Sequence, residues 1–253
     1  MIRDLRQILD GWTYEPGKIS VRKILGRDGR EKIQTRIDLG VMQLELTGRP
    51  DGARPHDCES LLEHHEQRLH QHLDIHGNDD DFVLAPEDCR DLRHEAYLYY
   101  QRYLAFFVLE EYDGVVRDTA RNLRVIDLCE RYAATPRDRE VLRPQRPYVM
   151  MMHARAAALH ALARGKAPAA LRIVERGLAD LDRLRTDAHE EDTCGHELAT
   201  LHALRRDVLE RLPDGAPARL RSQLEAALAA EDYERAAALR DQLTHGSEPS
   251  TSA

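Results

Sequence analysis

The sequence has few cysteines and no long hydrophobic run. Four cysteines occur among the 253 residues: Cys58, Cys89, Cys129 and Cys194. Their wide spacing provides no paired-thiolate motif for a metal, and it indicates reduced thiols rather than a disulfide framework. The most apolar stretch, residues 149–163, contains two histidines and an arginine, so it does not suit a bilayer. We therefore expect a soluble cytoplasmic protein without a signal peptide or a membrane span.

Lysine is scarce and negative charge dominates. Four basic residues are lysine and 33 are arginine, and the net charge is −8. This charge argues against a protein that coats nucleic acid, because phosphate binding depends on clustered cations. The excess of arginine over lysine is more typical of a GC-rich genome than of arginine-specific recognition, so scattered arginines do not by themselves indicate a function.

Familiar catalytic patterns are also missing. The glycines at Gly26-Arg27-Asp28-Gly29 lack the lysine and serine or threonine that complete a phosphate-binding loop. No serine lies in a nucleophile-elbow sequence. No acidic residue stands alone in an apolar stretch that would tune its pKa for acid–base catalysis. We expect neither an enzyme nor a bound cofactor.

The clearest positive pattern lies in residues 220–243. Apolar residues recur there at three- and four-residue steps in two runs, which indicates one stripe on each of two helices. Glu231-Asp232-Tyr233 breaks the pattern, and Asp232 is a suitable N-cap for the second helix. The small Ala236-Ala237 pair allows another helix to approach closely. A hairpin of this size is below the ~40 residues at which chains usually fold alone, so we expect it to rely on a partner.

This stretch closely resembles the UVR motif. The motif positions are taken by Leu220, Leu224, Ala227, Glu231-Asp232-Tyr233, Ala236-Ala237, Leu239, Arg240-Asp241 and Leu243. The family more often has phenylalanine where this chain has Tyr233. In the family the motif is a protein-docking hairpin, found in the B and C subunits of the bacterial excision-repair nuclease, in Clp-type unfoldases and in the activator of a protein-arginine kinase. The resemblance implies a way of binding and no particular reaction.

The N-terminal residues 1–55 contain the strand-like region. Residues 33–39 alternate between apolar and polar side chains, residues 19–21 do so too, and a third strand is expected at 42–46 after Gly40. A three-residue loop with a left-handed Gly29 would pair Ile19 with Ile37 and keep their apolar faces together. A two-residue loop would separate these faces. We therefore predict a three-stranded antiparallel element with the longer loop.

Residues 56–212 have helical patterns. Asp57 is expected to cap a helix that reaches about Ile75, and Pro86 fits the first turn of the next helix. That helix carries an apolar stripe: Tyr97, Tyr100, Leu104, Phe107 and Val108. Further helices are expected between breaks at residues 111–114, 135–147, 165–167 and 212–217.

Two of the central helix pairs weakly resemble tetratricopeptide repeats. Gly165, Ala170 and Val174 match the turn and second helix of that repeat, whereas Val115 and its neighbours match less well. Val115 and Ala170 lie 55 residues apart instead of 34. We expect a degenerate helical-repeat body, with a plain helical bundle as the alternative.

A histidine-rich segment suggests a metal site as one alternative. On the predicted helix, His65, His72 and His76 lie along one side, and the last two are one turn apart, at the spacing for a shared metal. The glutamate of the zinc-protease helix is absent, and Cys58 or Asp79–Asp81 would have to supply a third ligand. A partly apolar helix face packed on the sheet explains the same pattern, so the main prediction contains no metal.

Two other groups have a structural and a functional interpretation. The first is either core, a base-stacking platform or a peptide groove: Tyr97, Tyr99, Tyr100, Tyr103, Phe106 and Phe107. The second is a basic hairpin: Lys18, Arg22, Lys23, Arg27, Arg30, Lys32 and Arg36. Residues 1–55 contain 11 basic and 8 acidic residues, which favours a solvated strand face over a nucleic-acid contact.

The sequence therefore predicts a mostly α-helical adaptor. It comprises a β element (1–55), a helical-repeat-like body (56–212), a docking hairpin (217–245) and a disordered tail (246–253). The hairpin would bury eight residues against a like hairpin, in a second copy or another protein: Leu220, Leu224, Ala227, Leu228, Tyr233, Ala236, Leu239 and Leu243. Flanking charges would select the partner: Glu231, Glu234, Arg240 and Asp241. The alternatives are a nucleic-acid-associated repair-type accessory factor and a metal-binding stress sensor.

Overall fold

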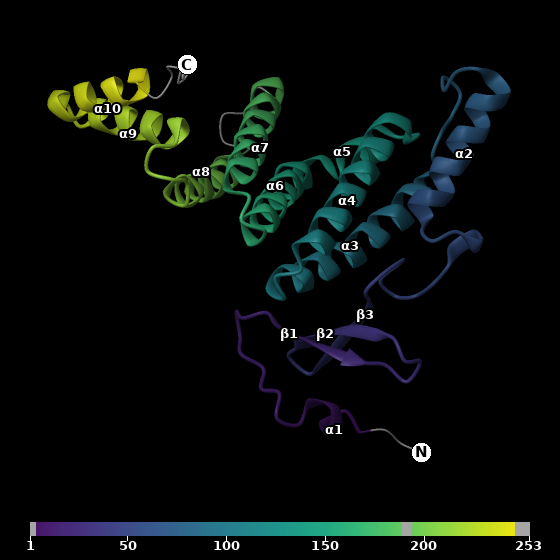
Figure 1. The fold of residues 1–253 in the computed structure, drawn as a ribbon. Coiled ribbons are helices and arrows are strands. Elements are labelled where there is room, and N and C mark those ends of the chain that lie inside the picture. Colours follow the sequence, from purple (N-terminus) through teal and green to yellow (C-terminus); the bar gives the residue numbers. More distant parts are fainter. Residues whose placement is uncertain (1–3, 189–193, 246–253) are drawn as a thin grey trace, which may run out of the picture. The chain divides into compact units, whose positions relative to one another are not determined.

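The structure is a computed structural model that describes residues 4–188 and 194–245. It is mostly helical, with an N-terminal three-stranded antiparallel sheet and a C-terminal helix pair, as predicted (Figure 1). Its contacts divide the chain into two compact units, Met1–Ala156 and Ala157–Ala253, and the division falls within helix α6. The predicted domain boundaries at residues 55 and 212 do not coincide with this division and stay predictions. The predicted tail, 246–253, lies outside the described residues.

The sheet has the predicted register. Its strands are β1 (Ser20–Leu25), β2 (Glu31–Ile37) and β3 (Gly40–Glu45), in the order β1-β2-β3. Ser20 pairs with Arg36, which aligns Ile19 with Ile37. The amide of Gly26 donates to the carbonyl of Arg30, and Gly29 has a φ of +74°. The three-residue loop and its left-handed glycine are therefore confirmed.

The basic hairpin is solvated only in part: Lys18, Arg27 and Arg30 are exposed, whereas the basic face of the sheet is covered. Lys32 is buried, and its Nζ contacts the carboxylates of Asp28 and Glu45. The guanidinium of Arg22 lies 4.1 Å from the ring centroid of Trp12 and donates to the carbonyl of Ile8. The segment that contains the short helix α1 (Arg6–Leu9) thus contacts this face, which alternation within the strands alone does not reveal.

Three long helices form the helical part of the first unit: α2 (Leu61–His76), α3 (Pro86–Val108) and α4 (Tyr112–Tyr132). Short elements accompany them, namely η1 (Pro55–Asp57), α5 (Pro136–Glu140), η2 (Arg143–Gln145) and the start of α6 (Arg146–Ala163). The predicted N-cap Asp57 is wrong. Ser60 caps α2, because its hydroxyl accepts from the amide of Glu63 while the Glu63 carboxylate accepts from the amide of Glu59.

The buried face of α3 differs from the predicted stripe by about one residue. Its buried apolar residues are Cys89, Leu92, Ala96, Tyr99, Tyr103, Ala105 and Phe106. Tyr97 and Val108 are exposed, and Tyr100, Leu104 and Phe107 are half-buried. The buried face also includes Glu95 and Arg102, two charged residues that an apolar pattern does not count.

The second unit contains α7 (Ala167–Ala188), α8 (Gly195–Glu210), α9 (Pro217–Ala229) and α10 (Tyr233–His245). Helix α6 ends in a turn at Gly165, which has a φ of +69°. Helix α7 packs against α8 through a core of aliphatic residues: Leu171, Val174, Leu178, Leu181, Leu198, Leu201, Leu204 and Val208. These helices fit the expected helical body, while its tetratricopeptide-like character stays a prediction.

Candidate docking site

The C-terminal hairpin consists of α9 and α10, which pack against each other in antiparallel orientation (Figure 1). Its core is a small apolar seam between the two helices. Leu220 and Ala227 from α9 and Ala236 and Leu239 from α10 are buried, and Leu224 and Leu243 pack partly against them. Six of the eight residues that were predicted to meet a partner therefore contact one another within the hairpin. Their role in docking stays a prediction.

The turn between the helices is held by backbone hydrogen bonds. The amide of Asp232 donates to the carbonyl of Ala227 at 2.9 Å, and the amide of Glu231 donates to that of Leu228 at 3.1 Å. This pair of bonds is a Schellman motif. The carboxylate of Asp232 accepts from the amide of Arg235 at 3.1 Å, which confirms it as the N-cap of α10.

Glu231 has a left-handed backbone conformation, with a φ of +57°. A residue with a Cβ pays a conformational cost there that glycine avoids. We predict that Glu231→Gly raises the free energy of unfolding of the hairpin by about 1 kcal/mol, measured by thermal unfolding with circular dichroism. As a matched control, Glu225→Gly in the middle of α9 should lower it by about 1 kcal/mol. A decrease for Glu231→Gly would show that this side chain has a stabilising role.

The hairpin leaves large apolar side chains exposed around its turn. Leu228 is 50% exposed and Tyr233 is 68% exposed. Successive residues of a helix are rotated by ~100° about its axis. Leu228 follows the seam residue Ala227 by one position, and Tyr233 precedes the seam residue Ala236 by three positions. Both are therefore rotated away from the seam in the same sense about their own helix. Because the helices are antiparallel, this rotation places Leu228, Tyr233 and Ala237 on one lateral face. We call Leu228, Tyr233 and Ala237 the docking face.

The predicted flanking charges are exposed around the docking face. Glu231, Glu234, Arg240 and Asp241 all face solvent, and Arg240 and Asp241 approach each other at 3.6 Å. An exposed pair of this kind contributes little to stability, and the role of these charges in selecting a partner stays a prediction. At the base of the hairpin, Arg219 donates to the carbonyl of Leu212 and pairs with Asp214, which fixes α9 to the segment before it.

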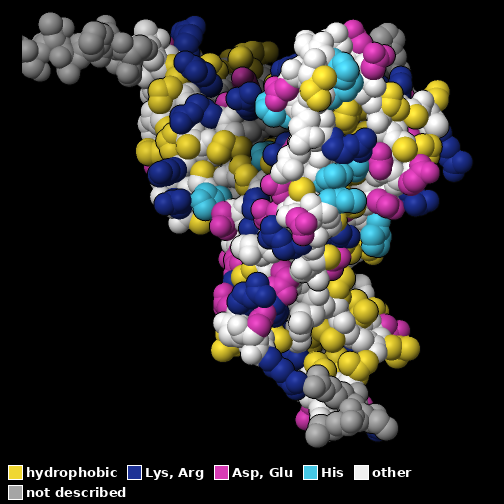
Figure 2. Space-filling view, turned by 90° about the vertical axis from the view of Figure 1, so that its right-hand side faces the viewer, with side chains coloured by type: hydrophobic (Ala, Val, Ile, Leu, Met, Phe, Trp, Pro, Cys, Tyr) yellow, Lys and Arg dark blue, Asp and Glu magenta, His cyan; other side chains and the backbone are white. Residues whose placement is uncertain are grey.

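The histidine-rich helix does not assemble a metal centre. Among the described residues, no group of three or more His, Cys, Asp or Glu side chains is placed to hold a metal ion. The rings of His72 and His76 lie 4.4 Å apart, whereas His65 is buried and its Nδ1 accepts from Arg68 at 2.9 Å. The face drawn in Figure 2 shows histidine side chains at several separate places. The geometry gives the metal-sensor alternative no support.

The burial of His65 predicts a pH dependence. Burial lowers the pKa of His65 to about 4, while an unfolded chain protonates the same ring near 6.5. The unfolded state therefore binds the proton first, and stability falls as the pH drops from about 6.5 to about 4. Urea titrations at about pH 7 and about pH 4.5 measure how much of the free energy of unfolding is lost between the two pH values. This loss should be about 2 kcal/mol smaller in His65→Asn than in the wild type.

The control for this prediction is His70→Asn, which changes a histidine whose side chain is 77% exposed. It should reproduce the wild-type difference between the two pH values. An unchanged difference in His65→Asn would contradict the assignment.

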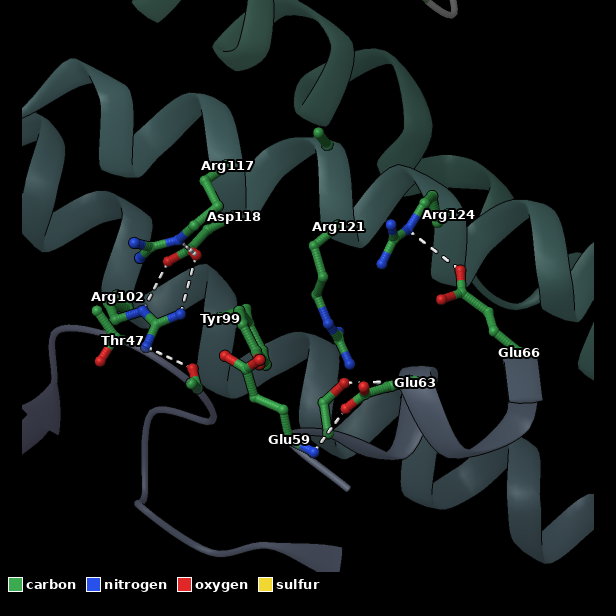
Figure 3. Close-up of a pocket in the computed structure, with 13 residues that line it drawn as sticks. Thr47, Glu59, Glu63, Glu66, Tyr99, Arg102, Arg117, Asp118, Arg121 and Arg124 are labelled. Carbon is green, nitrogen blue, oxygen red and sulfur yellow. Dashed lines mark hydrogen bonds and ion pairs between the residues drawn. The ribbon is translucent and has the colours of Figure 1, made fainter. Parts of the chain in front are cut away.

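The first unit contains a charged cavity of about 670 Å³ next to Tyr99. Figure 3 shows Arg102 and Arg117 around Asp118, and Arg124 beside Glu66. Arg121 pairs with the buried Glu95, and its guanidinium lies 4.0 Å from the ring centroid of Tyr99. Burial lowers the pKa of Arg121 to about 9 and raises that of Tyr99 to about 12. Each arginine that lines the cavity thus has a carboxylate partner.

The charged network connects the sheet to the helices. Arg102 donates to both oxygens of Asp118, at 2.7 and 2.9 Å, and to the carbonyls of Glu45 and Gly48. Arg117 donates to the carbonyl of Leu46. Glu95 accepts from the amides of Leu61 and Leu62 at the start of α2. Sequence reasoning missed these residues, and the geometry indicates a structural role for them.

The basic hairpin residues are mostly occupied by contacts within the chain. Lys23 pairs with Glu111, Arg30 pairs with Asp28, and Arg36 donates to the carbonyls of Trp12 and Gly40. Arg30 nevertheless stays 74% exposed, and an exposed ion pair of this kind contributes little to stability. The nucleic-acid-associated alternative stays a prediction.

Within the described residues, no helix combines the length and the apolarity needed to cross a membrane.

Comparison with protein families agrees with the hairpin geometry. Comparisons with curated proteins and with solved structures gave no match. A family model described as the UvrB/uvrC motif matches residues 218–245. The chain thus contains a UVR motif, which spans α9 and α10 and suggests a helical hairpin for protein–protein interaction.

Proposed function

We propose that this protein is a non-enzymatic adaptor that docks through its C-terminal hairpin against a like hairpin, in a second copy of the chain. The helical body would offer a further binding surface. One observation carries the proposal. The hairpin completes its own seam and still exposes Leu228 and Tyr233 on one lateral face.

An isologous contact suits this face. In a two-fold arrangement the docking faces of two hairpins would pack Leu228 and Tyr233 against their own counterparts. Ala237 lies one turn after Tyr233, and its small side chain would let the helices approach. Arg240 and Asp241 lie at the edge of the same face and carry opposite charges, so a two-fold partner could pair with each of them.

The energetics favour weak and reversible binding. Burying a leucine or tyrosine contributes roughly 1.5–3 kcal/mol for each side chain, and these residues are already partly covered. The loss of translational and rotational freedom offsets much of this gain. We therefore expect a dissociation constant of about 1–100 µM. Such an interaction would respond to the concentration of the protein.

Retention of an untagged copy by a tagged copy of the full chain tests the proposal. The wild-type pair should co-purify at concentrations above the dissociation constant. Leu228→Glu in both copies should remove this retention, because it places a charge at the centre of the docking face. Absence of retention in the wild type, or equal retention in the variant, would refute self-docking.

A further inference from the structure

A second cavity lies in the first unit, between α3, α4 and residues 141–149. Its volume is about 520 Å³, within the range typical of ligand pockets. Tyrosines 97, 100, 103 and 148 line it, together with Ile126, Val141, Leu142, Pro144 and Val149. All of these residues belong to one compact unit, so the cavity is formed without the hairpin.

The tyrosine rings form a connected aromatic wall. Tyr100 is the common member: its ring centroid lies 6.1 Å from that of Tyr97, 5.3 Å from Tyr103 and 6.4 Å from Tyr148. Tyr97 and Tyr100 are nearly parallel, with an interplanar angle of 27°. Tyr103 is buried, whereas Tyr97 is 56% exposed. The wall therefore offers ring faces and edges to an occupant at its open side.

The cavity has no free charge to offer a ligand. Arg93 is the charged residue of its lining, and its guanidinium is held by the carboxylate of Asp138 at 2.7 Å. Asn122 is also engaged, because its amide nitrogen donates to the carbonyl of Ala96 and its oxygen accepts from Arg121. This charge balance favours an uncharged occupant over a phosphate, a carboxylate or an ammonium group.

The lining supplies hydrogen-bond donors beside its ring faces. Within the described part of the chain, the hydroxyls of Tyr97 and Tyr100 make no side-chain hydrogen bond. Gln145 lines the same cavity and carries a side-chain amide. An occupant therefore needs flat apolar groups for the rings and acceptors for the hydroxyls. A polyproline II segment has both, because its proline rings are apolar and its carbonyls have no internal partner.

We propose that this cavity binds a proline-rich segment of a partner protein in the polyproline II conformation. Aromatic-lined grooves recognise such segments because the extended helix is already formed and loses little entropy on binding. Tyr97 and Tyr100 would pack against proline rings and donate to backbone carbonyls, and Val141 and Pro144 would form the facing apolar wall. This site would give the adaptor a second partner, independent of the hairpin.

Fluorescence anisotropy with a labelled decaproline peptide and the full chain tests this proposal. We expect saturable binding of decaproline and none of an alternating glycine–serine peptide of equal length. Tyr97→Ala should weaken binding by about fivefold or more, since one aromatic contact is lost. Val141→Glu, on the opposite wall, should weaken it independently. Both side chains are substantially exposed, so both variants should keep the wild-type circular dichroism.

Tyr233→Ala is the matched control, because it removes an exposed tyrosine from the hairpin. Tyr233→Ala should leave decaproline binding unchanged and weaken self-association. Tyr97→Ala should weaken decaproline binding and leave self-association unchanged. Failure of this proposal is thus distinguishable from failure of hairpin docking. Three results would overturn it: no binding of decaproline, wild-type affinity in both cavity variants, or Tyr97-dependent binding of oligothymidine in place of the peptide.

Discussion

Replacing Asp118 with alanine should lower the free energy of unfolding of the first unit by about 3–5 kcal/mol. The carboxylate of Asp118 and the guanidinium of Arg102 are each 1% exposed. Removing the carboxylate leaves Arg102 charged, buried and without its ion-pair partner, which is among the most costly point changes in proteins. Urea denaturation followed by circular dichroism and by fluorescence of the single tryptophan, Trp12, would measure the loss.

Two further variants test whether the loss of stability depends on the burial of the ion pair and on the charge that is left without a partner. Asp91→Ala breaks the exposed pair with Arg90 and should cost less than about 1 kcal/mol. The double variant Arg102→Leu with Asp118→Leu removes both charges and should recover part of the lost stability. Recovery should be incomplete, because Arg102 also donates to the carbonyls of Glu45 and Gly48. An Asp118→Ala cost equal to that of Asp91→Ala would contradict the structural role of this network.

Tyr233→Asp combined with Ala237→Glu should weaken self-association by about 100-fold or more. The change replaces an exposed aromatic ring and a small residue with two carboxylates on the docking face. In a two-fold contact each substitution occurs twice, so four negative charges would be brought together. Dilution calorimetry of the full chain would measure the change in dissociation constant.

The matched control lies on the opposite side of α10. Ala238 and Gln242 are exposed and rotated away from the docking face, so Ala238→Glu with Gln242→Glu adds the same charge at a different place. This control should retain nearly wild-type association. Equal weakening by both double variants would indicate a general effect of negative charge.

Local turns and strand register could be read from the sequence. Gly29 and the parity of the alternating residues predicted the pairing of β1 with β2, because only one loop length keeps the apolar faces together. Asp232 predicted the start of α10 for a similar local reason. The cap of α2 is equally local, since the Ser60 hydroxyl accepts from the amide of Glu63, so the prediction of Asp57 was wrong at a position that the local sequence could have given.

The charged core could not be read from hydrophobic periodicity. Glu95 and Arg102 lie seven residues apart on α3, on the same face as Leu92, Tyr99 and Phe106. A pattern that treats Glu95 and Arg102 as solvent-facing polar residues predicts a buried stripe through Tyr97, Tyr100 and Leu104 instead. Their burial is stabilised by partners on α4, above all Asp118, and long-range pairs of this kind are not visible in a local pattern.

The eight apolar residues of the candidate site were predicted to meet a partner together and are divided in the structure. A helical period shows that Leu220, Leu224 and Leu228 are apolar positions of the first helix, but it does not show which of them meet the second helix. That distinction requires the antiparallel packing of α9 on α10. With this packing, Leu220 and Leu224 belong to the seam and Leu228 and Tyr233 to the docking face.

Sedimentation equilibrium of the full chain tests the central claim most directly. The wild type should change from monomer to dimer between about 1 and 200 µM, and Tyr233→Asp with Ala237→Glu should remain monomeric throughout while keeping its helical content. A wild type that stays monomeric over this range, or a variant that dimerises as the wild type does, would contradict docking through the hairpin face.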